Sequence, residues 1–312
     1  MQILILGAGG IGGYFGGRLA AASTDVTFLV RRRRAVELAR DGLVIRSPCG
    51  DLRMPVKAVE RATRPFDLVV LACKAYDLEA ADEAVAPAVG PKTVILPLLN
   101  GLRHLAFLDA RFASSQVLGG LCHIGVTVNQ AGEIEHLNEL HELTLGARAE
   151  AQAGAADAIH AALARGGVGP RNSATISQDM WEKFVFLASY AGITCCMRAP
   201  IGAVARTDDG AALTIALLEE CAAVAGAAGF RPRPDFMARA RASLTDRSSN
   251  GTSSMLRDIW RGAPTEHDHI LGDLLSRAAE FGLATPILRI VRAHLQAYAA
   301  TPAISHVAPS YS

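Results

Sequence analysis

The first half of the chain alternates short apolar runs with amphipathic stretches. The apolar runs are typical of strands buried on both faces of a parallel sheet, and they lie at residues 3–6, 26–30, 67–72 and 93–96. Helix-compatible stretches separate them, at residues 11–22, 35–40 and 78–85. Two further short strands are expected at 43–46 and 52–56, and a hairpin that finishes the sheet at 121–145. This order predicts an α/β domain with a doubly wound parallel sheet.

The second half follows a helical pattern. A glycine-rich stretch at residues 166–170 ends the alternation, and alanine-rich segments with apolar residues every three or four positions follow it. We therefore predict an α/β domain over residues 1–170 and an all-α domain over residues 171–312. A chain of 312 residues is long enough for each domain to have its own core.

Three glycines follow the first predicted strand in the spacing G-x-G-x-x-G, at Gly7, Gly9 and Gly12. The first permits a tight turn, the second lets a pyrophosphate approach the backbone, and the third lets the helix lie against the strand. A turn without a ligand can carry the same glycines, but here the strand at 26–30 completes the βαβ unit of a dinucleotide site. The residues expected to contact the cofactor here are Gly7, Ala8, Gly9, Gly10, Ile11, Gly12 and Gly125.

The residue after the second strand distinguishes NAD from NADP. Arg31, followed by three more arginines, stands where NAD-binding chains usually place an acid. A guanidinium bound to a 2′-phosphate contributes about 1.5–3 kcal/mol, so we expect NADP(H), held by Arg31. Arg33 and Arg34 are better explained as the solvated start of a helix.

Two polar residues follow later strands of the predicted sheet. Lys74 comes after the strand at 67–72, and Asn100 after the strand at 93–96. Ligands of doubly wound sheets bind beyond the carboxyl ends of the strands, so both are candidates for the nicotinamide end of the cofactor. The simpler alternatives are a solvated lysine and an ordinary Asn-Gly turn.

Composition limits the classes of function. With 31 basic and 30 acidic residues the net charge is +1, so no overall field attracts nucleic acid or an anionic membrane. The longest mostly apolar run, residues 184–197, is too short to span a bilayer and predicts a buried helix. The N-terminus has no basic region of a signal peptide, and the six cysteines show neither C-x-x-C nor zinc-ligand spacing. These features predict a cytoplasmic protein without a bound metal.

The chain resembles the ketopantoate reductase (2-dehydropantoate 2-reductase) family over nearly its whole length. The resemblance lies in LGAGGIGGYFGGRLA, VTFLVRR, CKAYDL and LLNGL, and more specifically in MWEKF, NGTSSMLRDIWRG and PTEHDHILG. It implies a Rossmann-type domain followed by a helical domain, and NADPH-dependent reduction of a 2-oxo acid to a 2-hydroxy acid. The best single substrate is 2-dehydropantoate, an intermediate of pantothenate biosynthesis.

The resemblance also implies site residues. Lys183 of MWEKF matches the catalytic lysine, which protonates the carbonyl oxygen, and Glu266 of PTEHDH matches an acid that contacts substrate or nicotinamide ribose. Ser254 matches a substrate-binding serine, and Asn100 is expected to contact both ligands. Without the resemblance, Glu266 is explained as an acid in the first turn of a helix. His267 and His269 do not extend it into a metal site, because such positions on a helix point apart.

Three positions depart from the family. Asparagines that bind the substrate's carboxylate and hydroxyl are replaced by Leu187 and Ala191, and a further one by Ile201. Tyr190 and Thr194, on the same helix face as Lys183, are the remaining donors. The alternatives left open are a reductase of another, more apolar oxo acid, an enzyme that condenses an amine reductively, and a sensor that binds NADP(H) without turnover. The helical half can also form a homodimer.

Overall fold

The computed structural model describes residues 1–301, which divide into two compact units. The first contains residues 1–100 and 104–177, and the second contains residues 101–103 and the chain from residue 178 onward. The division comes after the two-residue strand β10 (Arg171–Asn172), because this strand pairs with a strand of the first unit.

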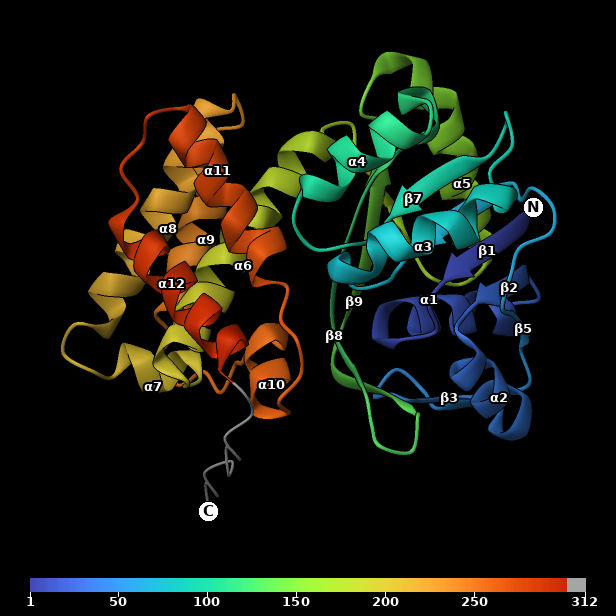
Figure 1. Cartoon of the computed structure of the whole chain (residues 1–312), viewed down its shortest axis with the longest axis horizontal. Helices are drawn as coiled ribbons and strands as arrows, with labels where there is room; N and C mark the ends of the chain where they lie inside the picture. The colour runs from blue at the N-terminus through green and yellow to red at the C-terminus, as the bar shows by residue number, and fades with distance from the viewer. Residues whose placement is uncertain (302–312) are drawn as a thin grey trace. The chain divides into compact units, whose positions relative to one another are not determined.

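The first unit contains a parallel five-stranded sheet in the order β5-β2-β1-β6-β7 (Figure 1). Its strands are β1 (Gln2–Leu6), β2 (Asp25–Leu29), β5 (Lys57–Val59), β6 (Leu68–Leu71) and β7 (Val94–Pro97). Alternate residues of β1 enter two different cores: Ile3 and Ile5 face one, and Leu4 and Leu6 face the other. The sheet is therefore buried on both faces, as its continuous apolar runs predict.

Helices cover both faces of this sheet. They are α1 (Gly10–Ala21), α2 (Arg32–Asp41), α3 (Leu78–Val85), α4 (Arg103–Arg111) and α5 (Ala153–Arg165). Leu19 of α1 and Ile159 of α5 join the core of Ile3, whereas Val85 of α3 and Leu108 of α4 join the core of Leu4. The unit is a Rossmann-type α/β domain, as the sequence predicts. Helices α4 and α5 and strand β5 were not predicted.

The hairpin prediction is right about the strands and wrong about their sheet. Strands β8 (Gly119–Val128) and β9 (Ile134–Gly146) pair in antiparallel fashion, with the turn at residues 129–132. They belong to a second sheet, in the order β10-β9-β3-β4, in which β8 also pairs with β9. Strands β3 (Leu43–Arg46) and β4 (Leu52–Met54) complete it, and an isolated bridge from Ile95 of β7 to Val117 lies just before β8.

Helix α1 lies between the two sheets, which explains why the hairpin forms a sheet of its own. A Cβ on Gly16 would collide with Ile5 and Phe28 of the first sheet, and one on Gly17 would approach Leu43 and Ile45 of the second. Glycines on two sides of one helix therefore let both sheets pack closely against it. Their cost in helix propensity, about 1 kcal/mol each, is offset by the burial of apolar strands against the helix.

The second unit is helical. Its helices are α6 (Ile176–Met197, which begins two residues before the division), α7 (Ile201–Ala205), α8 (Gly210–Ala227), α9 (Pro234–Leu244), α10 (Ser254–Trp260), α11 (Asp273–Glu280) and α12 (Pro286–Ala300). A π-helical turn, η5 (Asp268–Gly272), precedes α11. The apolar run at 184–197 lies inside α6, as predicted. Within residues 1–301, α8 alone is long and apolar enough to cross a membrane, but it packs against α7, α9, α11 and α12 as a core helix does.

Candidate active site

The three motif glycines of the first unit occupy three different environments. Gly7 adopts φ +95°, in the left-handed region, and its N–H donates to the carbonyl oxygen of Leu29 (3.0 Å). A Cβ on Gly12 would overlap the carbonyl oxygen of Gly7, whereas a Cβ on Gly9 would meet no atom within 4 Å. Gly7 and Gly12 are thus required by the fold itself. Gly9 borders open space at the N-terminus of α1, where a pyrophosphate fits.

The strand that carries Gly125 lies beside this turn. The register of β8 against β9 shifts between Ile124 and Val126, and a Cβ on Gly10 would stand 2.9 Å from Val126. Ala8, in the middle of the turn, is buried, and Ile11 in the first turn of α1 is half-buried. The predicted cofactor residues around Gly9 are therefore neighbours in space, including Gly125, which is distant in sequence.

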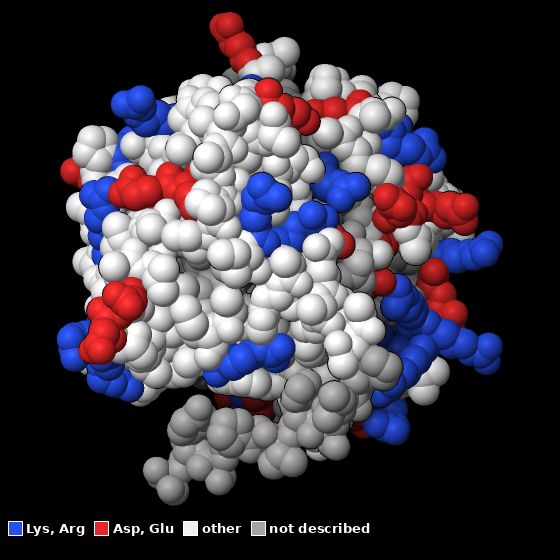
Figure 2. All heavy atoms as spheres, turned by 60° about the vertical axis from the view of Figure 1, so that its left-hand side comes forward, with Lys and Arg blue, Asp and Glu red and all other residues white. Residues whose placement is uncertain are grey.

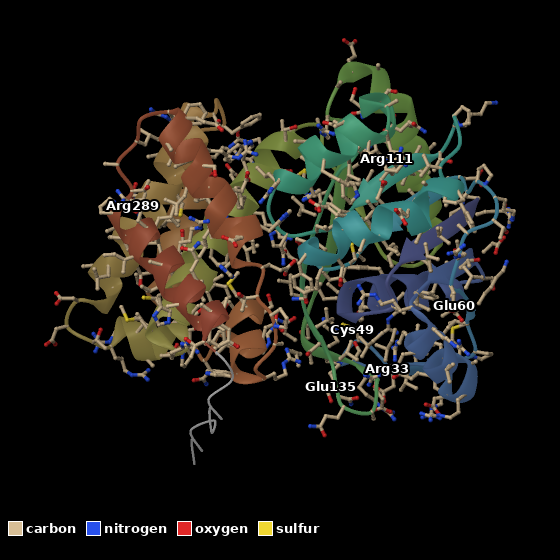
Figure 3. All side chains as sticks on the ribbon, viewed as in Figure 1. Arg33, Cys49, Glu60, Arg111, Glu135 and Arg289 are labelled. Atoms are coloured by element: carbon tan, nitrogen blue, oxygen red, sulfur yellow. The ribbon has the colours of Figure 1, made fainter. Side chains whose placement is uncertain are left out.

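Arg31 follows the end of β2 by two residues and occupies the N-cap position of α2, without a side-chain capping bond. Its side chain is 77% exposed, and its guanidinium forms an ion pair with Asp77 (2.5 Å), which directly precedes α3. Arg33, labelled in Figure 3, and Arg34 pair with Glu37 on their own helix. Arginine and acid are therefore paired along this edge. On the face shown in Figure 2, basic and acidic side chains are likewise interspersed.

Lys74 and Asn100 follow two adjacent strands at the same distance from their carboxyl ends. Leu71 of β6 pairs with Pro97 of β7, and each candidate follows its paired residue by three positions. Both side chains are half-buried. Because the two strands are parallel, Lys74 and Asn100 lie at the same edge of the sheet, beyond its carboxyl ends, where a dinucleotide site is expected.

In the second unit, α6 carries Lys183. Its side chain is half-buried and forms no hydrogen bond or ion pair with any residue in the part of the chain that the structure describes. The preceding residue, Glu182, is buried and accepts hydrogen bonds from the Arg233 side chain (2.6 and 2.8 Å) and backbone (2.8 Å). Arg233 also pairs with Asp179 (2.5 Å). This network attaches the start of α6 to the segment before α9, next to the lysine.

The network keeps its acid charged. Burial by itself would raise the pKa of Glu182, but the hydrogen bonds from Arg233 and Gln178 hold that pKa below its ordinary value. The same bonds raise the pKa of Arg233. An ionised pair is therefore fixed one residue from Lys183, whose own ammonium has no such partner among residues 1–301.

Thr194 and Tyr190, the other predicted hydrogen-bond donors of α6, differ in their burial and in the partners of their hydroxyl groups. Thr194 is fully buried, and its hydroxyl bonds to the carbonyl oxygen of Tyr190 (2.7 Å) and the hydroxyl of Ser253 (2.9 Å). It can reach a substrate only by giving up one of these bonds. Tyr190 is half-buried and stacks on Phe186, and burial raises the pKa of its hydroxyl, which stays protonated at neutral pH as a donor.

Ser254 and Glu266 lie on the segment around α10. Ser253 caps α10 by accepting a hydrogen bond from the N–H of Leu256 (3.1 Å), so the hydroxyl of Ser254, the first helical residue, is not used as the cap. Glu266 is buried, and its carbonyl oxygen accepts from the N–H of Ile270 as the π-helical turn begins. Such turns occur frequently at functional sites, and no periodicity of the sequence had indicated this one.

No metal site is evident in the described part of the chain. Residues 1–301 contain no group of three or more His, Cys, Asp and Glu side chains placed to hold a metal ion. Burial lowers the pKa of His267, whose ring bonds to the hydroxyl of Thr265 (2.8 Å). His267 is thus neutral at pH 7 and hydrogen-bonded within the fold.

The six cysteines are all free, and three of them, Cys122, Cys195 and Cys221, are buried. Burial raises the pKa of Cys195 and Cys221 to about 12, so both thiols are unreactive. Cys49, labelled in Figure 3, differs because it is exposed, and its sulfur lies 3.4 Å from Nδ1 of His141.

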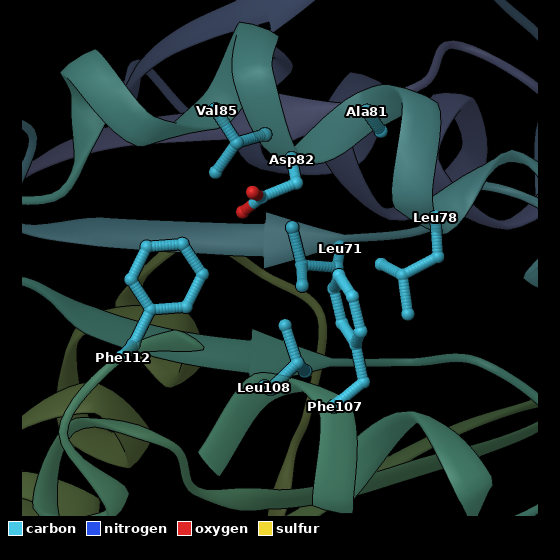
Figure 4. A pocket seen from close by; sticks show the side chains of 8 residues that line it. All are labelled: Leu71, Leu78, Ala81, Asp82, Val85, Phe107, Leu108 and Phe112. Atoms are coloured by element: carbon cyan, nitrogen blue, oxygen red, sulfur yellow. The ribbon is translucent and has the colours of Figure 1, made fainter. Parts of the chain in front are cut away.

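A small pocket of the first unit lies away from the candidate residues. Figure 4 shows its lining, which comes from β6, α3, α4 and the residue after α4. The lining residues are Leu71, Leu78, Ala81, Asp82, Val85, Phe107, Leu108 and Phe112. One oxygen of Asp82 accepts a hydrogen bond from Arg111 (2.6 Å), and the other side chains are apolar. The pocket contains none of the residues predicted to bind cofactor or substrate.

One functional candidate was missed at the level of sequence. Arg257 of α10 is half-buried, and its Nη1 donates to the carbonyl oxygen of Thr252 (2.5 Å). Within residues 1–301 it forms no ion pair. Among 31 basic residues nothing in the sequence distinguishes it, because its burial depends on helices distant along the chain.

Comparison with known proteins identifies the family. Residues 3–150 match the family model described as "Ketopantoate reductase PanE/ApbA", and residues 175–299 match the model of its C-terminal part. The uncharacterized oxidoreductase YkpB of Bacillus subtilis is 38% identical over 301 residues, covering 96% of this chain and 99% of that protein.

Two solved structures share the fold. The 2-dehydropantoate 2-reductase of Geobacter metallireducens is 26% identical, with a TM-score of 0.88 over 95% of this chain and 99% of that one. A D-mandelate dehydrogenase, solved with NADH and anilino(oxo)acetate, is 20% identical, with a TM-score of 0.88 over 96% and 98% of the two chains. Together with the site geometry, these matches show that the chain belongs to the ketopantoate reductase family of oxidoreductases, which use a nicotinamide dinucleotide.

Proposed function

We propose that the protein reduces a 2-oxo acid to the corresponding 2-hydroxy acid with NADPH. The observation that carries this proposal is Lys183, whose ammonium is half-buried and has no counter-ion among residues 1–301. Such a group is costly to retain unless negative charge develops beside it. The carbonyl oxygen of an oxo acid gains that charge when hydride reaches the neighbouring carbon.

The chemistry assigns a separate task to each candidate residue. NADPH, when bound, supplies a hydride to C2 of the oxo acid. Lys183 holds the carbonyl oxygen and gives it a proton as the alkoxide forms, so the 2-hydroxy acid is released neutral at that oxygen. Glu266 binds the substrate or the nicotinamide ribose. Ser254, Tyr190 and Asn100 donate hydrogen bonds to the substrate.

The cofactor proposal rests on two places in the first unit: the N-terminus of α1 and the residue that follows the C-terminus of β2. Gly9 leaves open space for the pyrophosphate, and Arg31 presents an exposed guanidinium where a 2′-phosphate would lie. A phosphate dianion would compete with Asp77 for this guanidinium, and charge-assisted bonds to phosphate favour the exchange. Lys74 is the proposed contact at the nicotinamide end.

The substrate proposal is 2-dehydropantoate, with a more apolar oxo acid as the alternative. Three asparagines implied by the resemblance are replaced by Leu187, Ala191 and Ile201, of which the last two are buried. A site that has lost amide donors discriminates less in favour of a hydroxylated substrate. The D-mandelate dehydrogenase that shares the fold was solved with anilino(oxo)acetate, so the fold can accommodate an aromatic oxo acid.

The remaining proposals concern location and assembly. A reducing compartment suits the six free cysteines, so we place the protein in the cytoplasm, as a homodimer. A sensor that binds NADP(H) without turnover is disfavoured by Lys183, which has no ion-pair partner among residues 1–301 and lies next to a fixed ionised network, because binding alone needs no proton donor.

The decisive assay follows NADPH oxidation with a panel of oxo acids. The panel contains 2-dehydropantoate, branched and aromatic 2-oxo acids, and the same acids with an added amine. Turnover with at least one acid in the absence of amine is expected, and the highest kcat/KM identifies the substrate class. Tight NADPH binding without any turnover would instead support the sensor, and turnover only with amine would support reductive condensation.

A further inference from the structure

Arg257 is a cation of the second unit that has no counter-ion among residues 1–301. Several arginines of this unit pair with acids, among them Arg233 with Asp179 and Glu182, Arg261 with Asp258, and Arg277 with Asp273. Arg257 forms hydrogen bonds to Thr252 alone, through Nη1 to the backbone oxygen (2.5 Å) and more weakly to the hydroxyl (3.4 Å). Its Nε is buried without a hydrogen-bond partner in the described residues.

The surroundings of Arg257 are the proposed substrate residues. Ser254 lies three positions earlier on α10, so the two side chains share a helix face. Tyr190 of α6 lies close enough for its hydroxyl to interact electrostatically with the guanidinium, and a Cβ on Gly251 would stand 2.9 Å from that hydroxyl. The hydrogen bond between Thr194 and Ser253 fixes α6 against the start of α10 (2.9 Å). The guanidinium is therefore held beside the face of α6 that carries Lys183.

Keeping the charged guanidinium of Arg257 half-buried is unfavourable when no anionic ligand is bound. Burial lowers the pKa of Arg257, with the neighbouring Tyr190 acting in the opposite direction. A desolvated cation without a partner costs free energy, which an anionic ligand would recover. A guanidinium suits a carboxylate in particular, because its planar fork can donate two parallel hydrogen bonds. The free Nε is one of the donors that such a pair uses.

The proposed substrate brings a carboxylate that lacks its expected partners. Where the resemblance implies asparagines that bind this group and the hydroxyl, the chain has Leu187 and Ala191, whose side chains offer no donors. We propose that Arg257 binds the carboxylate of the 2-oxo acid and so supplies the recognition that these two positions have lost. The inference rests on the proposed function and makes Arg257 a specificity-determining residue of the same site.

The test compares an oxo acid with its neutral methyl ester in four proteins. These are the wild type, Arg257→Met, Arg257→Lys and the control Arg261→Met, which removes an exposed arginine at the C-cap of the same helix. Arg257→Met is expected to lower kcat/KM for the acid by about 10- to 100-fold, mostly through KM, and to leave the ester nearly unchanged. Arg257→Lys should recover part of the loss, and Arg261→Met should behave as wild type.

Two results separate failure of this inference from failure of the proposed function. If Arg257→Met lowers kcat/KM for acid and ester equally, or alters neither, while the wild type turns over the acid, Arg257 does not bind the carboxylate and the function stands. If the wild type reduces no oxo acid at all, the proposed function fails first. Unchanged NADPH affinity and an unchanged circular dichroism spectrum of Arg257→Met exclude misfolding. If Arg257→Met unfolds the protein, the acid and the ester are compared with Arg257→Lys instead. The proposal then requires that Arg257→Lys lose selectivity for the acid over the ester at least several-fold.

Discussion

The glycine turn of the first unit and the lysine face of the second are built by different means. The turn recognises its ligand mainly through the backbone: Gly7 and Gly12 set the shape, and Gly9 leaves space. The face of α6 works through side chains, Lys183 and Tyr190, whose neighbours Ser254 and Arg257 come from a helix about 60 positions later. A backbone site is encoded within a dozen residues, whereas a side-chain site is assembled by the fold. We therefore propose that the first defines the class of cofactor and the second defines the reaction and the substrate.

The sharpest test of this contrast is the removal of the proposed proton donor. Lys183→Met should lower kcat by about 10²–10⁴-fold, because the alkoxide would lose its proton source and its electrostatic partner. NADPH affinity should stay within a factor of about two, as the lysine makes no part of the turn. Steady-state kinetics and a fluorescence titration with NADPH measure the two quantities, and Lys57→Met, an exposed lysine, serves as the control. A large loss of NADPH affinity would make Lys183 a cofactor ligand instead.

The choice of cofactor should depend on Arg31 alone among the neighbouring arginines. Arg31→Ala should weaken NADPH binding by about 10- to 100-fold and leave NADH binding nearly unchanged, because only the 2′-phosphate loses a charge-assisted bond. Arg33→Ala removes an exposed arginine paired with Glu37 and is the matched control. Titrations with both dinucleotides check this expectation. Equal losses for NADPH and NADH would show that Arg31 does not recognise the 2′-phosphate.

Two glycine variants distinguish a glycine that leaves room for the cofactor, Gly9, from one that leaves room for the backbone of the protein itself, Gly12. Gly9→Ala places its methyl group in open space and keeps φ at −81°, so thermal stability should be unchanged while NADPH affinity falls by about tenfold. Gly12→Ala would force its methyl group into the carbonyl oxygen of Gly7 and should cost about 1–3 kcal/mol of stability as well. Thermal melts with and without NADPH distinguish the two. Equal destabilisation by both variants would contradict the separation.

The smallest effect concerns the network beside Lys183. The pKa of Glu182 is lowered in the folded protein, so the unfolded chain takes up this proton first as the pH falls. Its contribution to stability is therefore complete above the pKa of an unfolded glutamate, about 4.3, and is lost as the pH drops through the lower folded value.

Glu182→Gln should accordingly be less stable than wild type at pH 7, by about 1–3 kcal/mol, because the ion pair with the half-exposed Arg233 is only partly screened by solvent. The difference should shrink below about pH 4. Urea unfolding at a series of pH values measures it. A difference that stays constant with pH would mean that Glu182 is not the group whose ionisation stabilises the helix.

The same contrast, between features encoded locally and features assembled by the fold, explains which parts of the structure could be predicted from the sequence. The strands of the parallel sheet and the turn at Gly7 were predictable, because apolar runs and glycine spacing are local signals. The placement of the hairpin was not, because it depends on Gly13 and Gly17 of α1 receiving Ile134 and Leu43 on the side away from the first sheet. Lys183 and Glu266 were identified through the resemblance, since no local pattern distinguishes them. The burial of Arg257 and the π-helical turn after Glu266 depend on tertiary packing and were found only in the structure.

The central claim is that Lys183 protonates the reduced carbonyl. A crystal structure with NADP⁺ and the 2-hydroxy acid product tests it most directly. The account predicts the lysine Nζ within hydrogen-bond reach of the hydroxyl oxygen on C2, about 2.7–3.2 Å. A product whose C2 oxygen is bound by other groups, with the Nζ of Lys183 turned toward solvent, would contradict it.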